Sequence, residues 1–194
     1  GQDLTTPTTL RDLLSVLLEQ TAVPRLRLSS IEPWNFDPAL LDLWAGGRLC
    51  RHFHLALQSG SDAVLQRMRR PYDTAGFTRL LETIRRRIPD AAITTDVIVG
   101  FPGESEAEFA ESLRCVAALD FAAVHVFPYS PRRRTAASKL PNQVPPGVKR
   151  ERVAAMLAVA ATAAHRFRQR FLGRTMDVLY QRVVTGATGG EGRQ

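Results

Sequence analysis

The chain has 194 residues, which suffices for one domain but falls short of the roughly 250 residues of a closed eight-stranded βα barrel. Its hydrophobic content of 44% is that of a folded globular protein, and its longest apolar run, residues 153–164, is too short to span a membrane. The net charge of +7 favours a polyanionic partner such as nucleic acid, although an arginine-rich codon bias would produce the same excess.

Strand and helix signals alternate along the first 130 residues. Strands are predicted over residues 25–30, 51–59, 92–100 and 122–129. Helices are predicted over residues 10–20, 37–45, 61–87 (broken near Pro71) and 104–119. Two ends carry specific signals: Gly46-Gly47 closes the second helix, and Ser105 to Glu108 form a capping box for the last one. Strands separated by helices of this length predict parallel βαβ units with right-handed crossovers.

The pattern changes after Tyr129. Residues 131–147 are rich in Arg and Pro and are typical of a loop. A long helix is predicted over residues 148–172, ended by Gly173, and residues 174–183 resemble the first strand of another module. The Gly-rich tail from Gly186 is predicted to be flexible.

The two cysteines bear on redox state and metal binding. Cys50 and Cys115 are isolated among apolar neighbours and form no C-x-x-C pattern. Their positions predict buried thiols rather than a disulfide or a metal centre, which fits a reducing cytoplasm. The chain begins at Gly1 and shows no signal peptide, so we expect it to be a piece of a longer protein.

Each predicted strand has one apolar and one polar face, because side chains alternate along a strand. The apolar set is Leu26, Leu28, Phe53, Leu55, Leu57, Ile93, Val97, Val99, Val124 and Val126. The polar set is Arg25, Arg27, Ser29, His52, His54, Gln58, Thr94, Asp96, His125 and Tyr129. Parallel strands covered on both faces are normally apolar throughout. A sheet with one face in water would also show this pattern, but a carboxylate within a strand favours a partial barrel whose lumen holds a polar ligand.

The loops that follow the strands are where chemistry is expected in such folds. They comprise residues 29–33, 58–62, 100–104 and 127–130. Glycines there allow close backbone approach to a ligand. Ser61 and Ser105 are explained as helix caps, whereas Glu104 fits either a substrate site or a solvated surface.

Four motifs occur in register at these strand ends. They read RLRLSSIEP (25–33), HLALQSGSD (54–62), TDVIVGFPGE (95–104) and FPYSPR (127–132). In this order they resemble the radical S-adenosylmethionine methylthiotransferases that modify tRNA, and the resemblance extends over residues 1–180. The motifs SSIEP (29–33) and HVFPYS (125–130) are most similar to those of the branch that acts on N6-threonylcarbamoyladenosine beside the anticodon.

The resemblance implies an α/β fold, namely a partial (β/α)6 radical-SAM barrel to which this chain contributes strands three to six with their helices. It implies three parts. They are the carboxyl-terminal part of the barrel (1–147), a long connecting helix (148–172), and the truncated start of a small β-barrel TRAM module with a flexible tail (173–194).

The resemblance also implies a chemistry. The family inserts a methylthio group at C2 of a modified adenosine, with S-adenosylmethionine and two 4Fe-4S clusters as cofactors and the tRNA anticodon stem-loop as partner. Clusters need thiolate ligands, and this chain has no C-x-x-x-C-x-x-C motif. We therefore expect no metal ligand, no catalytic residue and no turnover in this chain alone. We further expect a cytoplasmic monomer without membrane contact.

Site residues follow from the motif positions. Implied cofactor-binding residues are Gln58 and Ser59 (methionine and ribose), Asp96, Ile98 and Gly100 (ribose and adenine), Phe127 and Tyr129 (adenine), and Ser29 and Glu32 (mouth). Implied substrate or RNA contacts are Glu104, Arg132, Arg133 and Arg134. Arg133 and Arg134 replace the Pro-Gly of the family. A positive φ at Arg134 would cost about 1 kcal/mol of conformational free energy. The two added arginines could equally bind phosphate.

Two other functions fit the same residues. One is another radical enzyme, or a βα-barrel enzyme with a different small ligand. The other is a non-catalytic RNA-binding derivative. Whichever holds, a barrel without its first two strands leaves an unpaired edge at residues 25–30, so we expect the isolated chain to be marginally stable and to aggregate.

Overall fold

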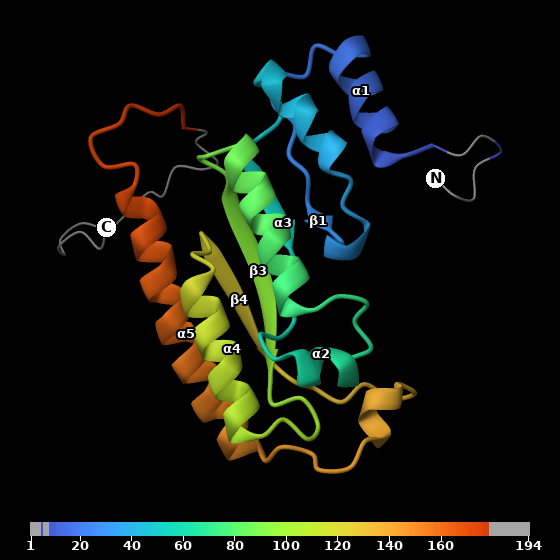
Figure 1. The fold of residues 1–194 in the computed structure, drawn as a ribbon, viewed down its shortest axis with the longest axis vertical. Coiled ribbons are helices and arrows are strands. Elements are labelled where there is room, and N and C mark those ends of the chain that lie inside the picture. Colours follow the sequence, from blue (N-terminus) through green and yellow to red (C-terminus); the bar gives the residue numbers. More distant parts are fainter. Residues whose placement is uncertain (1–4, 6–7, 179–194) are drawn as a thin grey trace, which may run out of the picture.

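The computed structural model describes residue 5 and residues 8–178, which form a parallel sheet with helices packed against it (Figure 1). The strands are β1 (Ser30–Ile31), β2 (His52–Leu55), β3 (Ala92–Val99) and β4 (Ala123–Pro128). The α-helices are α1 (Leu10–Gln20), α2 (Asp62–Arg67), α3 (Thr74–Arg87), α4 (Glu106–Ala118) and α5 (Pro146–Gln169). Three 3-10 helices complete the list: η1 (Pro33–Asn35), η2 (Pro38–Gly46) and η3 (Ala136–Lys139). The predicted α/β class is confirmed.

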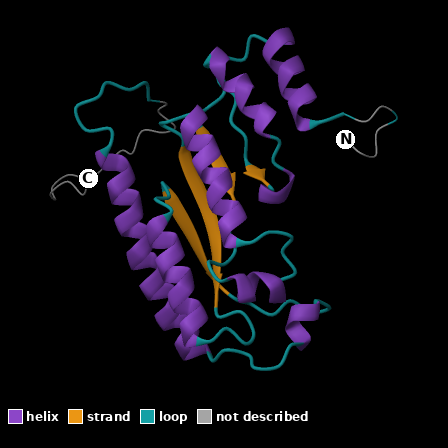
Figure 2. Ribbon diagram, viewed as in Figure 1, coloured by secondary structure: helices purple, strands orange, loops and turns teal. Residues whose placement is uncertain are grey.

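The strands pair in the order β1-β2-β3-β4, all parallel. Their carboxyl ends therefore lie at one edge of the sheet, at the lower end in Figure 2, where the loops gather. The first two helical segments, α1 and η2, lie toward the opposite end. Ligand sites of parallel sheets form at the carboxyl edge.

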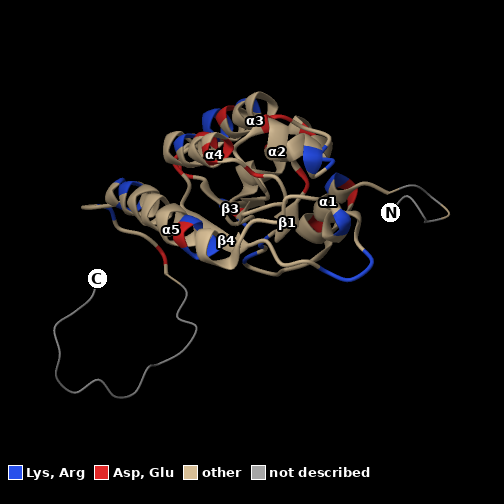
Figure 3. Ribbon diagram, turned by 90° about the horizontal axis from the view of Figure 1, so that it is seen from below, with Lys and Arg blue, Asp and Glu red and all other residues tan. Residues whose placement is uncertain are grey.

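One face of the sheet carries the hydrophobic core. Phe53, Leu55 and Leu57 are fully buried, as are Ile93 and Val97 to within 1%. Helices α2, α3 and α4 lie on one side of the sheet (Figure 3), and the core cluster includes residues from α3 and α4. In β2 and β3 buried and half-buried residues alternate strictly, so the predicted division into an apolar and a polar face is confirmed there.

Helix α5 packs against β4 and α4 through its small and apolar side chains. Met156 and Ala163 are fully buried, and Phe167 is nearly so. Among the described helices, none is both long and apolar enough to cross a membrane. Basic residues are spread over several helices (Figure 3) rather than gathered on α5.

The first predicted strand is much shorter than expected. Residues 25–30 form a single bridge, between Leu26 and Leu49, before β1 pairs at Ser30 with His54. Ser30 is four positions after Leu26, but His54 is five positions after Leu49. The extra residue forms a bulge between Leu49 and His54, where the amide of His52 donates a hydrogen bond to the carbonyl of Cys50 at 2.7 Å. The bulge interrupts the hydrogen bonding between the two segments. Residues 27–29 are not in a strand, and Leu28 lines the same cavity as Arg27, contrary to the predicted division of faces.

Helix ends follow the sequence signals closely. Helix α1 has the predicted bounds, and α4 begins with the predicted capping box between Ser105 and Glu108. The helix predicted over 37–45 is present as the 3-10 helix η2, capped by Asp37 and closed by Gly47 with φ 75°. Residues 174–178 are not in a strand, and the rest of the predicted TRAM strand lies outside the described residues.

Candidate functional site

A cavity of about 570 Å³ lies at the carboxyl ends of β3 and β4 and is called here the strand-end pocket. Its lining includes six of the predicted site residues: Gln58, Asp96, Ile98, Phe127, Tyr129 and Arg132. Arg70, Pro128, Ser130, Thr135 and Ala137 complete it. Its volume is within the range typical of small-molecule sites, about 300–1,000 Å³. The structure thus brings together predicted site residues that are up to 74 positions apart in sequence (Gln58 to Arg132).

Gln58 reaches the pocket through a second bulge. His54 pairs with Thr94 but Gln58 bridges to Val97, so the β2 side has one extra residue. The Gln58 backbone has φ 66°, which is uncommon for a residue with a side chain. Two hydrogen bonds of 2.8 Å hold it, from its amide to the Asp96 carbonyl and from the Ile98 amide to its own carbonyl. Such strained positions occur preferentially at functional sites.

Two aromatic side chains from β4 and the residue after it line the pocket with contrasting exposure. The Phe127 ring is 50% exposed, whereas the Tyr129 ring packs edge-on against Phe101 at 5.2 Å and lies under the Lys149 ammonium. The Tyr129 hydroxyl is buried without a hydrogen-bond partner among the described residues. A buried hydroxyl is normally paired, so the Tyr129 hydroxyl is an exception among the described residues.

Arg70 is a pocket residue that sequence reasoning missed. It follows α2, and its Nε is buried with no partner among the described residues. The sequence signal was weak, because Arg70 stands in an arginine-rich turn before Pro71.

The arginine loop meets the pocket at one end. Arg132 lines it, and its carbonyl accepts hydrogen bonds from the amide and hydroxyl of Thr135, which close a turn. Arg133 and Arg134 are exposed within that turn and do not line the pocket. Arg134 has φ 71°, the conformation expected if it replaces a left-handed glycine.

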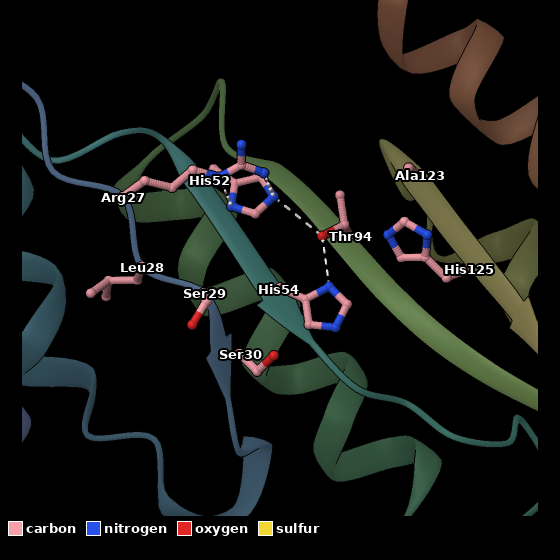
Figure 4. Close-up of a pocket in the computed structure, with 9 residues that line it drawn as sticks. All are labelled: Arg27, Leu28, Ser29, Ser30, His52, His54, Thr94, Ala123 and His125. Carbon is pink, nitrogen blue, oxygen red and sulfur yellow. Dashed lines mark hydrogen bonds between the residues drawn. The ribbon is translucent and has the colours of Figure 1, made fainter.

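Ser29 lies in a second cavity, of about 550 Å³, called here the histidine pocket. It opens on the polar face toward the amino ends of the strands, where Arg27, Leu28, Ser30, His52, His54, Thr94, Ala123 and His125 also line it (Figure 4). Glu32 is exposed and lines a third cavity, of about 490 Å³, beside the start of α1. The two residues predicted at the mouth are therefore not in the strand-end pocket.

Ser59 and Glu104 are also placed elsewhere. Ser59 is fully buried, and its hydroxyl lies 3.1 Å from that of Ser112 on α4. Gly100 has φ 72° and donates its amide to Glu104 at 2.6 Å, and a Cβ at Gly100 would lie 2.6 Å from the Lys149 side chain. The close backbone approach that this glycine allows is therefore to α5.

Glu104 forms a buried ion pair. Its side chain is 1% exposed and accepts a hydrogen bond from Arg152 Nη1 at 2.7 Å. Burial raises the pKa of Glu104, although the Gly100 amide and Arg152 oppose that shift. The pair ties the loop after β3 to α5, and the Glu104 carboxylate does not face the strand-end pocket.

The cysteines do not fit an iron–sulfur cluster. Cys50 and Cys115 are the chain's two cysteines, and each is half-buried and free. Burial raises the pKa of Cys115 to about 11, so its thiol is protonated at neutral pH. A cluster requires several thiolates converging on one point, and no step through a cluster can be derived from this chain.

The comparisons with known proteins agree with this geometry. The family model "Radical SAM superfamily" matches residues 5–116, more than half of the chain. The chain belongs to the radical SAM superfamily. The Escherichia coli coproporphyrinogen III oxidase HemN, described as a radical SAM enzyme, superposes with a TM-score of 0.63 over 78% of this chain and 36% of that one. At 21% identity that likeness shows the fold alone.

Curated relatives are tRNA methylthiotransferases. The chain is 39% identical over 180 residues to threonylcarbamoyladenosine tRNA methylthiotransferase MtaB of Thermotoga maritima, covering 92% of this chain and 41% of that protein. It is 44% identical over 156 residues to tRNA-2-methylthio-N(6)-dimethylallyladenosine synthase of Clavibacter michiganensis, covering 80% and 30%. The chain thus spans less than half the length of these relatives.

Proposed function

We propose that this chain forms the adenosine-binding half of a radical S-adenosylmethionine barrel in a tRNA methylthiotransferase. The observation that carries the proposal is the strand-end pocket, which unites six side chains predicted from separate motifs in a chain similar to those enzymes. A βα-barrel enzyme with another small ligand would also have a pocket at this edge, but would not be expected to share this similarity.

The pocket residues suit S-adenosylmethionine. The exposed Phe127 ring and Ile98 offer apolar surface to adenine, and Tyr129 lines the pocket beside them. Gln58 and Asp96 supply an amide and a carboxylate for ribose hydroxyls and an amino group. Radical formation is the chemistry that the bound cofactor supplies in this superfamily, and the role of these residues is to hold and orient it.

The RNA side of the proposal rests on charge. The net charge of +7 favours tRNA, Arg132 lines the pocket, and Arg133 and Arg134 follow it as exposed residues of the same turn. The partner would be the anticodon stem-loop of tRNA. The protein would act as a monomer in the cytoplasm. We take N6-threonylcarbamoyladenosine as the substrate because of the SSIEP and HVFPYS motifs. The dimethylallyl nucleoside is the second candidate, because a relative named for it is 44% identical.

The test expresses the gene that encodes this chain with its flanking coding sequence, in a host lacking its own methylthiotransferases. The product is reconstituted with iron and sulfide, and tRNA nucleosides are analysed by mass spectrometry. The proposal predicts a methylthio group on threonylcarbamoyladenosine. A product that binds iron but leaves all adenosines unmodified contradicts it, and a product that binds tRNA and no iron favours the non-catalytic derivative.

The pocket itself is tested in the same assay. Phe127→Ala removes the stacking surface and should lower methylthio formation about tenfold, the effect of losing roughly 1.4 kcal/mol of stacking. Leu172→Ala is the matched control, since Leu172 is also an exposed apolar side chain (77%) but follows the carboxyl end of α5. Equal activity of the two variants would exclude Phe127 from the site.

A further inference from the structure

Three metal-ligating side chains converge on the polar face of the sheet. His54 lies on β2, Asp96 on β3 and His125 on β4, and one ligand atom of each lies within 4.8 Å of the others. We propose that these three residues bind a divalent transition-metal ion, at a site separate from any iron–sulfur cluster. The two imidazoles do not line the strand-end pocket, whereas Asp96 does, so an ion bound here would share Asp96 with the proposed cofactor site.

Strand register brings the three together. Asp96 is directly opposite His125, and His54 is directly opposite Thr94, two residues before Asp96. Side chains two residues apart share a face, so all three point to the same side. The His54 Nε2 lies 3.3 Å from Asp96 Oδ2, and the imidazole centroids of His54 and His125 are 5.9 Å apart.

The spacing suits a small cation. With metal–ligand bonds of about 2.0–2.1 Å, tetrahedral ligand atoms lie about 3.3–3.4 Å apart, which is the His54–Asp96 distance already present. His125 is exposed on β4, so its ring can turn to close the third position. Two imidazoles and one carboxylate favour zinc or ferrous iron, and leave positions open toward the cavity.

The second shell supports this use of His54. Its Nδ1 lies 3.0 Å from the Thr94 hydroxyl, as Figure 4 shows. A metal-bound histidine almost always bonds an acceptor through its other ring nitrogen. With Nδ1–H donating to Thr94, the Nε2 lone pair faces Asp96 and the proposed ion.

The neighbouring positive charge is engaged elsewhere. Arg27 lines the histidine pocket, but its Nη2 lies 3.0 Å from a ring nitrogen of His52. The Arg27 Nε also donates a hydrogen bond to the His52 Nδ1, at 3.3 Å. Asp96 also shares the strand-end pocket with Arg70 and Arg132, so three guanidinium groups line the two cavities beside the site.

The test measures Zn²⁺ binding to the 194-residue chain by competition with a chromophoric chelator, and Co²⁺ binding by visible absorption. We expect one ion per chain and the d–d bands of a nitrogen and oxygen site. His125→Gln should weaken binding about tenfold or more, and this side chain is exposed, so the fold should survive. Asp96→Asn should do the same, and Thr94→Val should weaken binding about tenfold through His54.

The chain's other two histidines provide matched controls. His165→Gln on α5 and His52→Gln in the same cavity should leave the affinity within a factor of two to three of wild type. The proposal is overturned if no ion binds, if the His125 and Asp96 variants bind as wild type, or if His165→Gln loses binding equally. Thiolate charge-transfer bands would also overturn it, since they would place the ion on Cys50 or Cys115. In each of these cases His54 and Asp96 form only a polar contact within the sheet.

Discussion

Arg134 holds a backbone conformation that suits glycine. Its φ of 71° costs a residue with a Cβ about 1 kcal/mol. Arg134→Gly should therefore raise the free energy of unfolding by up to about 0.5 kcal/mol, after the entropic cost of glycine is subtracted. Urea denaturation measures the change. Arg133→Gly is the control, because Arg133 is not among the positive-φ residues and glycine there should stabilise nothing. Equal effects of the two substitutions would refute the strain.

Glu108 joins α4 to α2 through a charged pair. Arg67 donates two hydrogen bonds to it, at 2.9 and 2.8 Å, and the capping contacts with Ser105 add to this. These contacts lower the pKa of Glu108 to about 2, the Arg67 bond contributing most. A depressed folded-state pKa means that its stabilisation is complete above the ordinary value of 4.5 and is lost as the pH falls toward 2.

Glu108→Gln should accordingly cost about 1–2 kcal/mol at pH 7 and much less at pH 3. Denaturant midpoints at the two pH values measure the difference. Glu151→Gln, on the exposed side of α5, is the control and should show neither effect. A loss that is the same at both pH values would show that the Glu108 charge is not what stabilises α4.

At the scale of elements, the loop after β2 packs directly on α4. A Cβ added to Gly60 would lie 2.6 Å from the Cys115 Cβ and 2.8 Å from the Ser112 Cα, which is backbone. Gly60→Ala should destabilise the chain by about 1–3 kcal/mol, as overpacking does. Gly46→Ala, where nothing lies within 4 Å, should change stability by less than about 0.5 kcal/mol. Thermal melts compare the two, and an unaffected Gly60 variant would mean that the loop can move away.

Local signals predicted the helices better than the strands. Capping residues such as Thr9 and Ser105 mark helix starts in the sequence itself. The two bulges depend on register between segments that are about 23 and 39 residues apart, which no local pattern encodes. The role of the glycines at strand ends was ambiguous for the same reason. Gly60 and Gly100 allow close approach, but of helices α4 and α5 rather than of a ligand.

At the scale of the molecule, alternation along the strands was sufficient to predict that one face carries a polar cavity at the strand ends. It placed Gln58, Asp96 and Tyr129 together, and the strand-end pocket confirms that arrangement. It could not separate that pocket from the histidine pocket, because depth along a shared face depends on strand length and register. Glu104 was ambiguous in sequence, and its partner Arg152 lies 48 residues away on α5.

The sheet has an open side in this chain. Strand β1 pairs with β2 on one side, and no described strand pairs with its other edge. Unpaired edges promote association, so we predict a broad, concentration-dependent melt for the isolated chain, with aggregation visible by light scattering. A sharp, reversible and concentration-independent melt would contradict this prediction.

The central claim is that the carboxyl edge of this sheet holds the adenosine part of S-adenosylmethionine. A titration of the isotope-labelled chain with excess S-adenosylmethionine, followed by backbone amide NMR, tests it most directly. We expect the largest chemical-shift changes at the amides of Gln58, Ile98 and Tyr129 around the strand-end pocket. Shifts centred instead on the cavity beside Trp34 and Tyr72, or no shifts at any ligand excess, would contradict it.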